Sequence, residues 1–237
     1  WNLIHWPWFV VAVVLCIASA WGYLRLATPI YNVSATVLIK DDKKGGGASM
    51  SSELEKMGLD GFVSSSNNVD NEIEVLRSKS LAREVVNQLG LFVTYMDEDE
   101  FPGRELYRTS PVQVSLIPQE AEKLPHTMEV NMVLQPTGAM DVQIAVGEKK
   151  YQKQFDKLPA VFPTDEGTVA FFTNNDTLSS VRPESVTQVR HITAFINRPF
   201  SVAKEYASSL SIAPTSKTTS VVVVSLKNSS TQRGKDY

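Results

Sequence analysis

The side chains that most often perform catalysis or bind metals are few in this sequence, and they lie far apart. None of the three histidines, His5, His126 and His191, has a cysteine or carboxylate partner at metal-ligand spacing. The single cysteine, Cys16, lies in an apolar run, so no disulfide can form within the chain. The sequence contains no nucleophile elbow, no Walker A loop and no HExxH motif. We therefore predict that this segment is not an enzyme, with no catalytic residue, no cofactor and no bound metal.

Two polar clusters resemble ligand-binding loops only superficially. Gly45–Gly47 is not followed by the GK[ST] sequence that a phosphate-binding loop requires. The acidic run Asp97–Glu100 lacks the glycine and the distal glutamate of an EF-hand loop. A net charge of −3 offers no basic surface for nucleic acid. The sequence therefore predicts solvated loops at both places and no nucleic-acid partner.

The stretch Trp6–Leu24 contains no charged residue and is long enough to cross the hydrocarbon core of a membrane as a helix. Aromatic side chains, which prefer the membrane interface, stand near both of its ends, and a basic residue that can reach the headgroups follows it. We predict a transmembrane helix over residues 6–26, whose anchoring side chains are Trp6, Trp8, Trp21, Tyr23 and Arg25.

Three other interpretations of this stretch are weaker. A buried core helix would have a polar outer face, which this stretch lacks. A cleaved signal peptide is supported by Ala18–Ala20, which resembles a cleavage site, but the apolar run continues past it. A lipoprotein anchor at Cys16 would need a small residue where Leu15 stands. The chain begins without Met and stops at Tyr237, so we expect both ends to be internal positions of a longer protein.

Two segments after the anchor have clear periodicity. Tyr31–Ile39 alternates apolar with mostly polar residues, which predicts a strand with one buried face. Asn71–Gly90 has apolar residues at helical spacing, interrupted at Ser78–Ser80, which predicts two helices packed on that strand. We expect Ser80 to cap the second helix, Gly90 to end it, and one apolar side chain of each helix to be buried against the sheet. The apolar residues at helical spacing are Ile73, Leu76, Leu81, Val85 and Leu89. The two that we expect to be buried are Leu76 and Val85.

The second half of the chain is dominated by strand patterns. From Thr94 onward, short alternating runs and turn signals recur, which predicts a small β-sandwich or barrel. Helical spacing returns at Pro199–Leu210, with Phe200, Ala203, Ala207 and Leu210 on one face. Thr219–Leu226 is a nearly continuous β-branched run, typical of a strand covered on both faces. We expect it to pair with Tyr31–Ile39 in one sheet.

The predicted fold class is therefore α+β. It comprises the transmembrane helix, a discontinuous α/β domain formed by residues 27–93 and 197–237, and a β-sandwich-like domain inserted at residues 94–196.

Several of these segments together resemble a known family. The strand PIYNVSATVLIK, the segment NEIEVLRS leading to AREVV and LGL, and the late strand VVVVSLKNSS are similar to the chain-length determinant (Wzz-like) family of polysaccharide co-polymerases. The β-rich insertion makes the chain most similar to the periplasmic part of a Bacteroidetes-type capsular or exopolysaccharide tyrosine autokinase. The residues that carry the family signature and its core are Glu72, Ile73, Leu76, Ser78, Val85, Leu89 and Gly90.

The resemblance implies a membrane-anchored scaffold that regulates the length and export of a cell-surface polysaccharide, such as capsule, exopolysaccharide or O-antigen. It implies a bacterial inner-membrane location, with residues 28–237 in the periplasm, and a ring-like homo-oligomer. The implied partners are a polysaccharide polymerase, an export channel, a lipid-linked glycan and the membrane. Glu74, Arg77 and Arg83 are candidate oligomer contacts, because a mixed-charge helix edge can meet its complement on a neighbour. The alternative is a periplasmic adaptor (membrane-fusion) subunit of an export pump.

Overall fold

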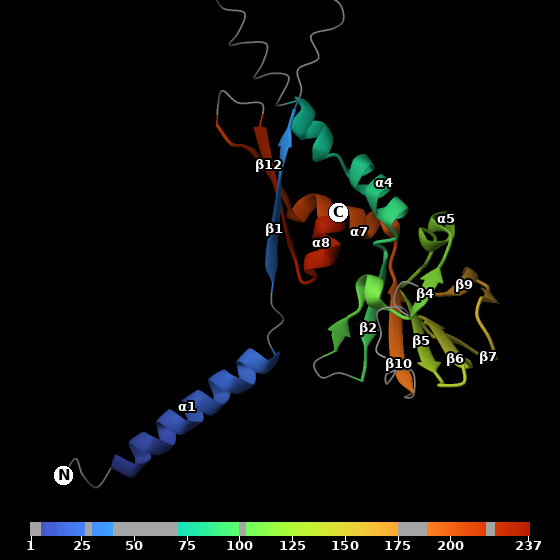
Figure 1. Ribbon diagram of the computed structural model, residues 1–237, viewed down its shortest axis with the longest axis horizontal. Coiled ribbons are helices and arrows are strands. Elements are labelled where there is room, and N and C mark those ends of the chain that lie inside the picture. Colours follow the sequence, from blue (N-terminus) through green and yellow to red (C-terminus); the bar gives the residue numbers. More distant parts are fainter. Residues whose placement is uncertain (1–5, 27–29, 40–70, 100–102, 175–188, 217–220) are drawn as a thin grey trace, which may run out of the picture.

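The computed structural model describes residues 6–26, 30–39, 71–99, 103–174, 189–216 and 221–237. Helices and sheets are both present, as the α+β prediction requires. A long helix, α1 (Trp6–Leu26), projects from a body in which three sheets and several short helices pack together (Figure 1).

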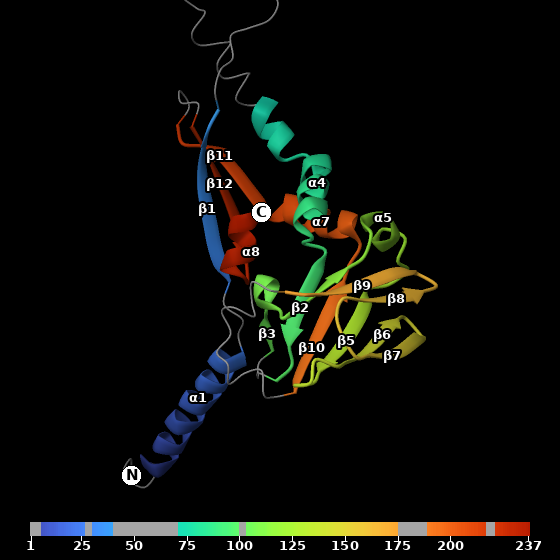
Figure 2. The same ribbon diagram turned by 45° about the vertical axis from the view of Figure 1, so that its right-hand side comes forward.

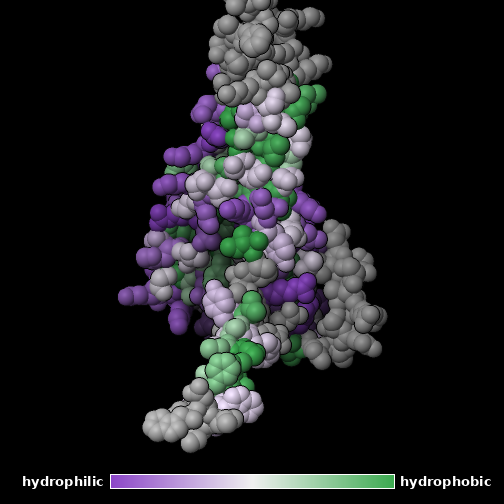
Figure 3. Space-filling model, turned by 90° about the vertical axis from the view of Figure 1, so that its left-hand side faces the viewer, coloured by the Kyte–Doolittle hydropathy of each residue, from purple (hydrophilic) through white to green (hydrophobic). Residues whose placement is uncertain are grey.

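α1 is exposed along its whole apolar length, and none of the window Trp6–Leu24 is buried inside the protein. A core helix would be mostly covered, so that interpretation is wrong. Length and composition make α1 a candidate membrane span, near the N-terminus. It extends below the body as a mainly hydrophobic or weakly polar rod in Figure 3.

The strand that follows α1 belongs to a three-stranded antiparallel sheet. β1 (Tyr31–Leu38) pairs with β12 (Val221–Asn228), from Tyr31 opposite Asn228 to Leu38 opposite Val221, and β11 (Leu210–Pro214) lies on the far side of β12. The predicted pairing is confirmed. β12 is not covered on both faces as expected: only Val222 and Leu226 are buried in it, because one face of this small sheet lies against the body and the other faces solvent.

The register of this sheet separates an apolar face from a polar one. Side chains at successive positions of a strand point to opposite faces, and paired residues share a face. The apolar face, made of three cross-strand rows, comprises Val33, Leu226 and Leu210, then Ala35, Val224 and Ile212, then Val37, Val222 and Pro214. The opposite face includes a row of three serines, Ser34, Ser225 and Ser211.

The predicted helical pair is present and broken where expected. Residues 71–76 are helical, the chain turns at residues 77–78, and α4 (Lys79–Leu89) follows. The cap of α4 is Ser78 rather than Ser80, because Ser78 has an extended backbone and its side chain accepts a hydrogen bond from the Leu81 amide. Gly90 ends α4 in the left-handed conformation with φ of 64°, as predicted.

The break sends the two helices in different directions. Ile73 packs with Ile212 and Val222 of the sheet, so residues 71–76 touch its apolar face. α4 then packs along α7 (Pro199–Ser209) and buries Ala82 and Val86. The face of α7 is rotated from the prediction: Val202, Ala203 and Tyr206 are buried, whereas Phe200 is 44 % exposed.

The β-rich region forms two packed antiparallel sheets, in agreement with the predicted sandwich (Figure 2). The larger sheet has the order β3-β2-β10-β5-β6-β7, and the smaller has β4-β9-β8. Phe155 of the first sheet contacts Phe162 and Phe171 of the second, with ring centroids 6.0 and 5.9 Å apart. The strands are β2 (Val93–Asp97), β3 (Arg104–Glu105), β4 (Val112–Ser115), β5 (Met128–Leu134), β6 (Met140–Val146), β7 (Lys149–Phe155), β8 (Ala160–Thr164), β9 (Gly167–Thr173) and β10 (Arg190–Ile196).

The described residues also form three shorter helical elements: a 3-10 turn (Tyr107–Thr109), α5 (Pro118–Ala121) and α8 (Thr231–Asp236). One hydrophobic core runs from the sandwich through α4 and α7 to Leu226 of β12. The sandwich is therefore packed against the rest of the body rather than attached by a linker.

Candidate functional site

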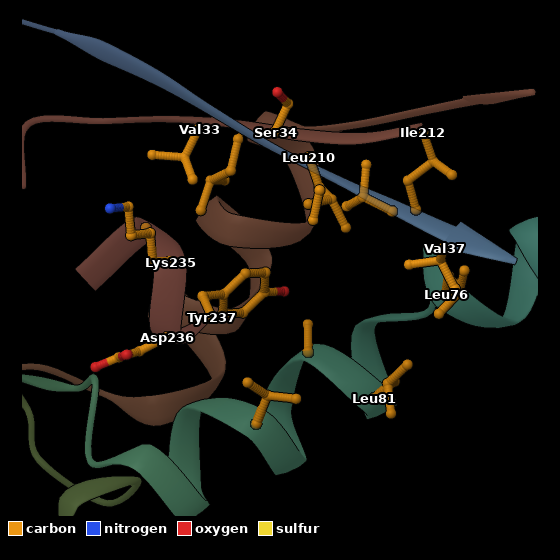
Figure 4. Close-up of a pocket in the computed structure, with 16 residues that line it drawn as sticks. Val33, Ser34, Val37, Leu76, Leu81, Leu210, Ile212, Lys235, Asp236 and Tyr237 are labelled. Carbon is orange, nitrogen blue, oxygen red and sulfur yellow. The ribbon is translucent and has the colours of Figure 1, made fainter. Parts of the chain in front are cut away.

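The most distinctive concave feature is an apolar groove between the small sheet and the helical pair. Its shape follows from the break at residues 77–78: residues 71–76 touch the sheet, whereas α4 leaves it to pack on α7. The wedge between them has a volume of about 370 Å³. Figure 4 shows the apolar face of β1 and β11 on one side and α4 on the other. Its walls include Val33, Ala35, Val37, Leu81, Val85 and Ile212.

Much of the apolar surface of this groove is in contact with solvent. Val37 is 41 % exposed and Leu81 is 38 % exposed, and Val85 and Leu76 are only half-buried. The expectation that Leu76 and Val85 would be buried against the sheet is therefore wrong in degree. Both side chains do line the space facing the sheet, but α4 stands away from it. Exposed apolar surface that is gathered in a concavity is typical of binding sites.

One end of the groove, beside Val33, is formed by α8 and carries the charged groups (Figure 4). Asp236 accepts a hydrogen bond from the Tyr107 hydroxyl at 2.9 Å and lies 3.1 Å from Arg108 Nε, so its charge is compensated. Lys235 forms no ion pair with another described residue. This end of the groove therefore has an excess positive charge at Lys235.

Tyr237 lies in the groove beside α8, and its ring stacks on that of Tyr206 with centroids 4.4 Å apart. Burial raises the pKa of the Tyr237 hydroxyl, and the neighbouring Tyr206 raises it further. Tyr237 therefore stays neutral at physiological pH and extends the apolar surface of the groove.

A buried arginine connects α8 to the sandwich. Arg233 donates hydrogen bonds to Glu105 Oε1 at 2.7 Å, to Thr94 Oγ1 at 2.9 Å and to the carbonyl of Leu91. Its Nε atom is buried with no hydrogen-bond partner among the described residues. α8 thus joins the sheet that follows α1 to strands β2 and β3.

Comparison with known families explains the first part of this arrangement. Residues 4–89 match the model of the Wzz family, described as chain length determinant protein. Over this stretch, which is about a third of the chain, the sequence is similar to the Wzz family. The match confirms the resemblance inferred from the sequence, and it covers α1, β1, residues 71–76 and α4. No curated protein matches the chain.

The residues of the Wzz signature have mainly structural positions. Ile73 is buried against the sheet, Ser78 caps α4, Gly90 ends it, and Leu89 packs at the margin of the main core. Glu72 is exposed. These residues fix where the helix breaks and ends, and so they determine the shape of the groove.

The candidate oligomer contacts also form interactions within the chain. Arg77 donates to the carbonyl of Ile212 at 2.7 Å and lies 3.9 Å from Glu74. Arg83 lies 3.9 Å from Glu122 of the α5 region. All three side chains are substantially exposed, so these weak surface pairs leave them accessible to another molecule.

The anchoring aromatic residues lie on the exposed α1 helix. Trp6 and Trp8 occupy one end and Trp21 and Tyr23 the other, all of them more than half exposed. The side chain of Arg25 lies outside the described residues, as do Gly45–Gly47 and Glu100.

Within the described part of the acidic run, Asp97 and Asp99 contact residues of β10. Asp97 lies 3.4 Å from Arg190, and Asp99 accepts hydrogen bonds from the backbone and the ring of His191. The backbone hydrogen bond from His191 is the main reason why the pKa of Asp99 is lowered. Among the described residues, no group of three metal-binding side chains comes together.

Sequence reasoning missed both the groove and the role of Arg233. The alternation of β1 indicated its apolar face, but not that α4 would stand away from that face. Arg233 lies in a polar C-terminal segment that carries no motif.

Proposed function

We propose that this chain is the anchoring part of a non-catalytic scaffold that sets the length of a cell-surface polysaccharide. The single observation that carries the proposal is the Wzz family match over α1, β1 and α4. The described residues offer apolar packing surfaces and structural ion pairs, and these suit a scaffold. The adaptor alternative is not favoured by this match.

The architecture supports a scaffold in which the strand after the candidate span is joined to the β-rich part. β1 begins at Tyr31, shortly after the candidate span ends at Leu26, and it pairs along its entire length with β12. α8 follows β12 and is bonded to the sandwich through Arg233. β12 and α8 therefore connect β1 to the β-rich part.

The finer features of the proposal come from the family resemblance. Residues 28–237 lie in the periplasm of a bacterium, and the parent protein assembles into a ring with a polysaccharide polymerase, an export channel and a lipid-linked glycan as partners. A closed ring requires two different lateral faces on each subunit. The exposed side chains Glu74, Arg77 and Arg83 supply one such face. A cytoplasmic tyrosine autokinase in the parent protein is part of the same proposal.

The deciding experiment measures polysaccharide length in the host bacterium. The gene of the parent protein is deleted, and the surface polysaccharide is separated by size on a gel. We expect the preferred length to be lost while material still reaches the surface, and a plasmid copy to restore it. An unchanged length distribution with a much smaller amount of exported material would contradict the proposal and favour the adaptor.

A further inference from the structure

The apolar groove is too exposed to be a simple packing defect. Side chains from β1, β11, β12, α4 and α8 converge on it, and residues from both walls present apolar surface to solvent. At about 370 Å³, its volume falls in the range of small-molecule sites in proteins.

The position and the charge of the groove indicate which class of ligand it can bind. Val33 and Ala35 lie near the start of the strand that follows the candidate membrane span, and they form one wall of the groove. The end of the groove beside Val33 carries Lys235, whereas the opposite end, near Leu76, is apolar (Figure 4). A molecule that matches this pattern has an apolar chain and an anionic head.

Charge compensation around Lys235 strengthens the match. The nearest carboxylate on α8, Asp236, is already paired with Arg108 and bonded to Tyr107. Lys235 has no ion pair with a described residue, so its ammonium group is available to an anion at the end of the groove.

We propose that the groove binds one acyl chain of an anionic membrane phospholipid, with the headgroup at Lys235. The apolar chain lies between the Ala35 wall and the Val85 wall and removes their surface from water. Each methylene buried in this way contributes to binding through the hydrophobic effect.

The test uses the complete 237-residue chain reconstituted into vesicles. The probe is phosphatidylglycerol that carries a photoactivatable diazirine near the end of one acyl chain, and adducts are located by mass spectrometry of peptides. Adducts on α1 provide the internal reference for contact with the bilayer. We expect additional adducts on peptides containing Ala35 and Val85. Adducts confined to α1 would overturn the proposal, as would crosslinks through the groove to a second copy in place of lipid.

Matched tryptophan variants test occupation of the groove itself. Ala35→Trp fills the groove, whereas Thr36→Trp places the same ring on the opposite face of the same strand, outside the groove. We expect Ala35→Trp to lower the ratio of groove to α1 adducts at least fivefold and Thr36→Trp to leave it within twofold. Val85→Phe fills the groove from the helical wall and should act like Ala35→Trp without altering the sheet. Equal ratios in all these proteins would overturn the proposal.

The headgroup contact has its own control. Lys235→Gln should remove the preference for phosphatidylglycerol over a phosphatidylcholine probe with the same diazirine chain. Lys227→Gln changes a lysine of β12 outside the groove and should preserve that preference. A preference unaffected by Lys235→Gln would overturn the assignment of the headgroup. Polysaccharide length does not enter this experiment, so a failure here leaves the proposed function standing.

Discussion

Arg233 Nη1 lies 2.7 Å from Glu105 Oε1, and the two side chains are only 8 % and 16 % exposed. Arg233 belongs to α8 and Glu105 to β3, so one buried ion pair connects the last helix to the sandwich. Burying two charges removes both from water, and the pair offsets that cost only while both members are present. The ion pair therefore stabilises the protein when both residues are present, and loss of either residue lowers the free energy of unfolding.

The first prediction follows from this pair. Glu105→Ala leaves the Arg233 guanidinium buried with less compensation, and we expect it to lower the free energy of unfolding by about 3 kcal/mol. Arg104→Ala changes the exposed neighbour on β3 and should alter it by no more than about 0.5 kcal/mol. Thermal unfolding in detergent, followed by circular dichroism, checks both values. Equal melting temperatures for the two variants would contradict a buried junction.

The second prediction concerns the start of α4. The Ser78 hydroxyl accepts a hydrogen bond from the Leu81 amide at 3.2 Å, so Ser78→Ala should destabilise the protein by about 1 kcal/mol. Ser80 lies inside the first turn and its hydroxyl reaches only that of Ser78, at 3.4 Å. Ser80→Ala should therefore have an effect close to zero. Thermal unfolding compares the two variants. A larger loss of stability for Ser80→Ala than for Ser78→Ala would show that Ser80 is the N-cap.

The third prediction separates the two neighbouring valines of α4. Val86 is fully buried in the main core, whereas Val85 lines the groove. Val86→Ala leaves a cavity and should cost about 2 kcal/mol, and Val85→Ala should cost less than about 1 kcal/mol. The midpoint temperatures of thermal unfolding of the two variants test this difference. A greater loss for Val85→Ala would show that α4 is rotated relative to the present structure.

The parts of the fold that sequence reasoning predicted correctly rest on local patterns. The alternating runs after Thr94 predict strands, and two of them, Met128–Leu134 and Met140–Val146, pair as the hairpin β5–β6. The β-branched run that ends at Leu226 predicts a strand, and its described part pairs with β1 as expected. β11 was missed because α7 passes directly into it at Leu210, with no glycine or proline between them.

The features that sequence reasoning missed depend on contacts between distant segments. The direction of α4 after Ser78 is set by α7, and the groove exists only because of that direction. Arg233 contacts residues that precede it by 128 and 139 positions. From sequence alone, a polar residue such as Arg233 is expected to be exposed. It is buried because β2, β3 and α8 come together around it in the folded protein.

The fourth prediction tests the side of the membrane. Thr137 is exposed in the β5–β6 turn, and Cys16 in α1 is the only native cysteine. We expect Thr137→Cys, introduced into a Cys16→Ser background, to react with an impermeant maleimide in intact spheroplasts. The Cys16→Ser protein alone is the control and should stay unlabelled. Labelling of Thr137→Cys only after lysis would contradict the proposed periplasmic location.

The last prediction is a pH dependence caused by Tyr95. This side chain is buried, and its hydroxyl accepts a hydrogen bond from the Val114 amide at 2.8 Å and donates to the Val114 carbonyl at 3.3 Å. Burial raises the pKa of the Tyr95 hydroxyl to about 12, although the hydrogen bond with Val114 acts in the opposite direction. In the unfolded chain the hydroxyl has an ordinary pKa near 10.

The stability that neutral Tyr95 contributes is therefore fully present below pH 10 and is lost as the pH rises through 12. Over that range the unfolded state releases a proton that the folded state retains, which lowers the free energy of unfolding by up to about 2.7 kcal/mol. Tyr95→Phe cannot titrate, and it loses about 1–2 kcal/mol at pH 7 because the Val114 amide is left without its acceptor. The difference in stability between wild type and Tyr95→Phe should thus shrink, and can reverse, between pH 10 and 12. Urea unfolding of both proteins at matched pH measures it, and because the other tyrosines titrate equally in both, a difference that stays constant would contradict the burial of Tyr95.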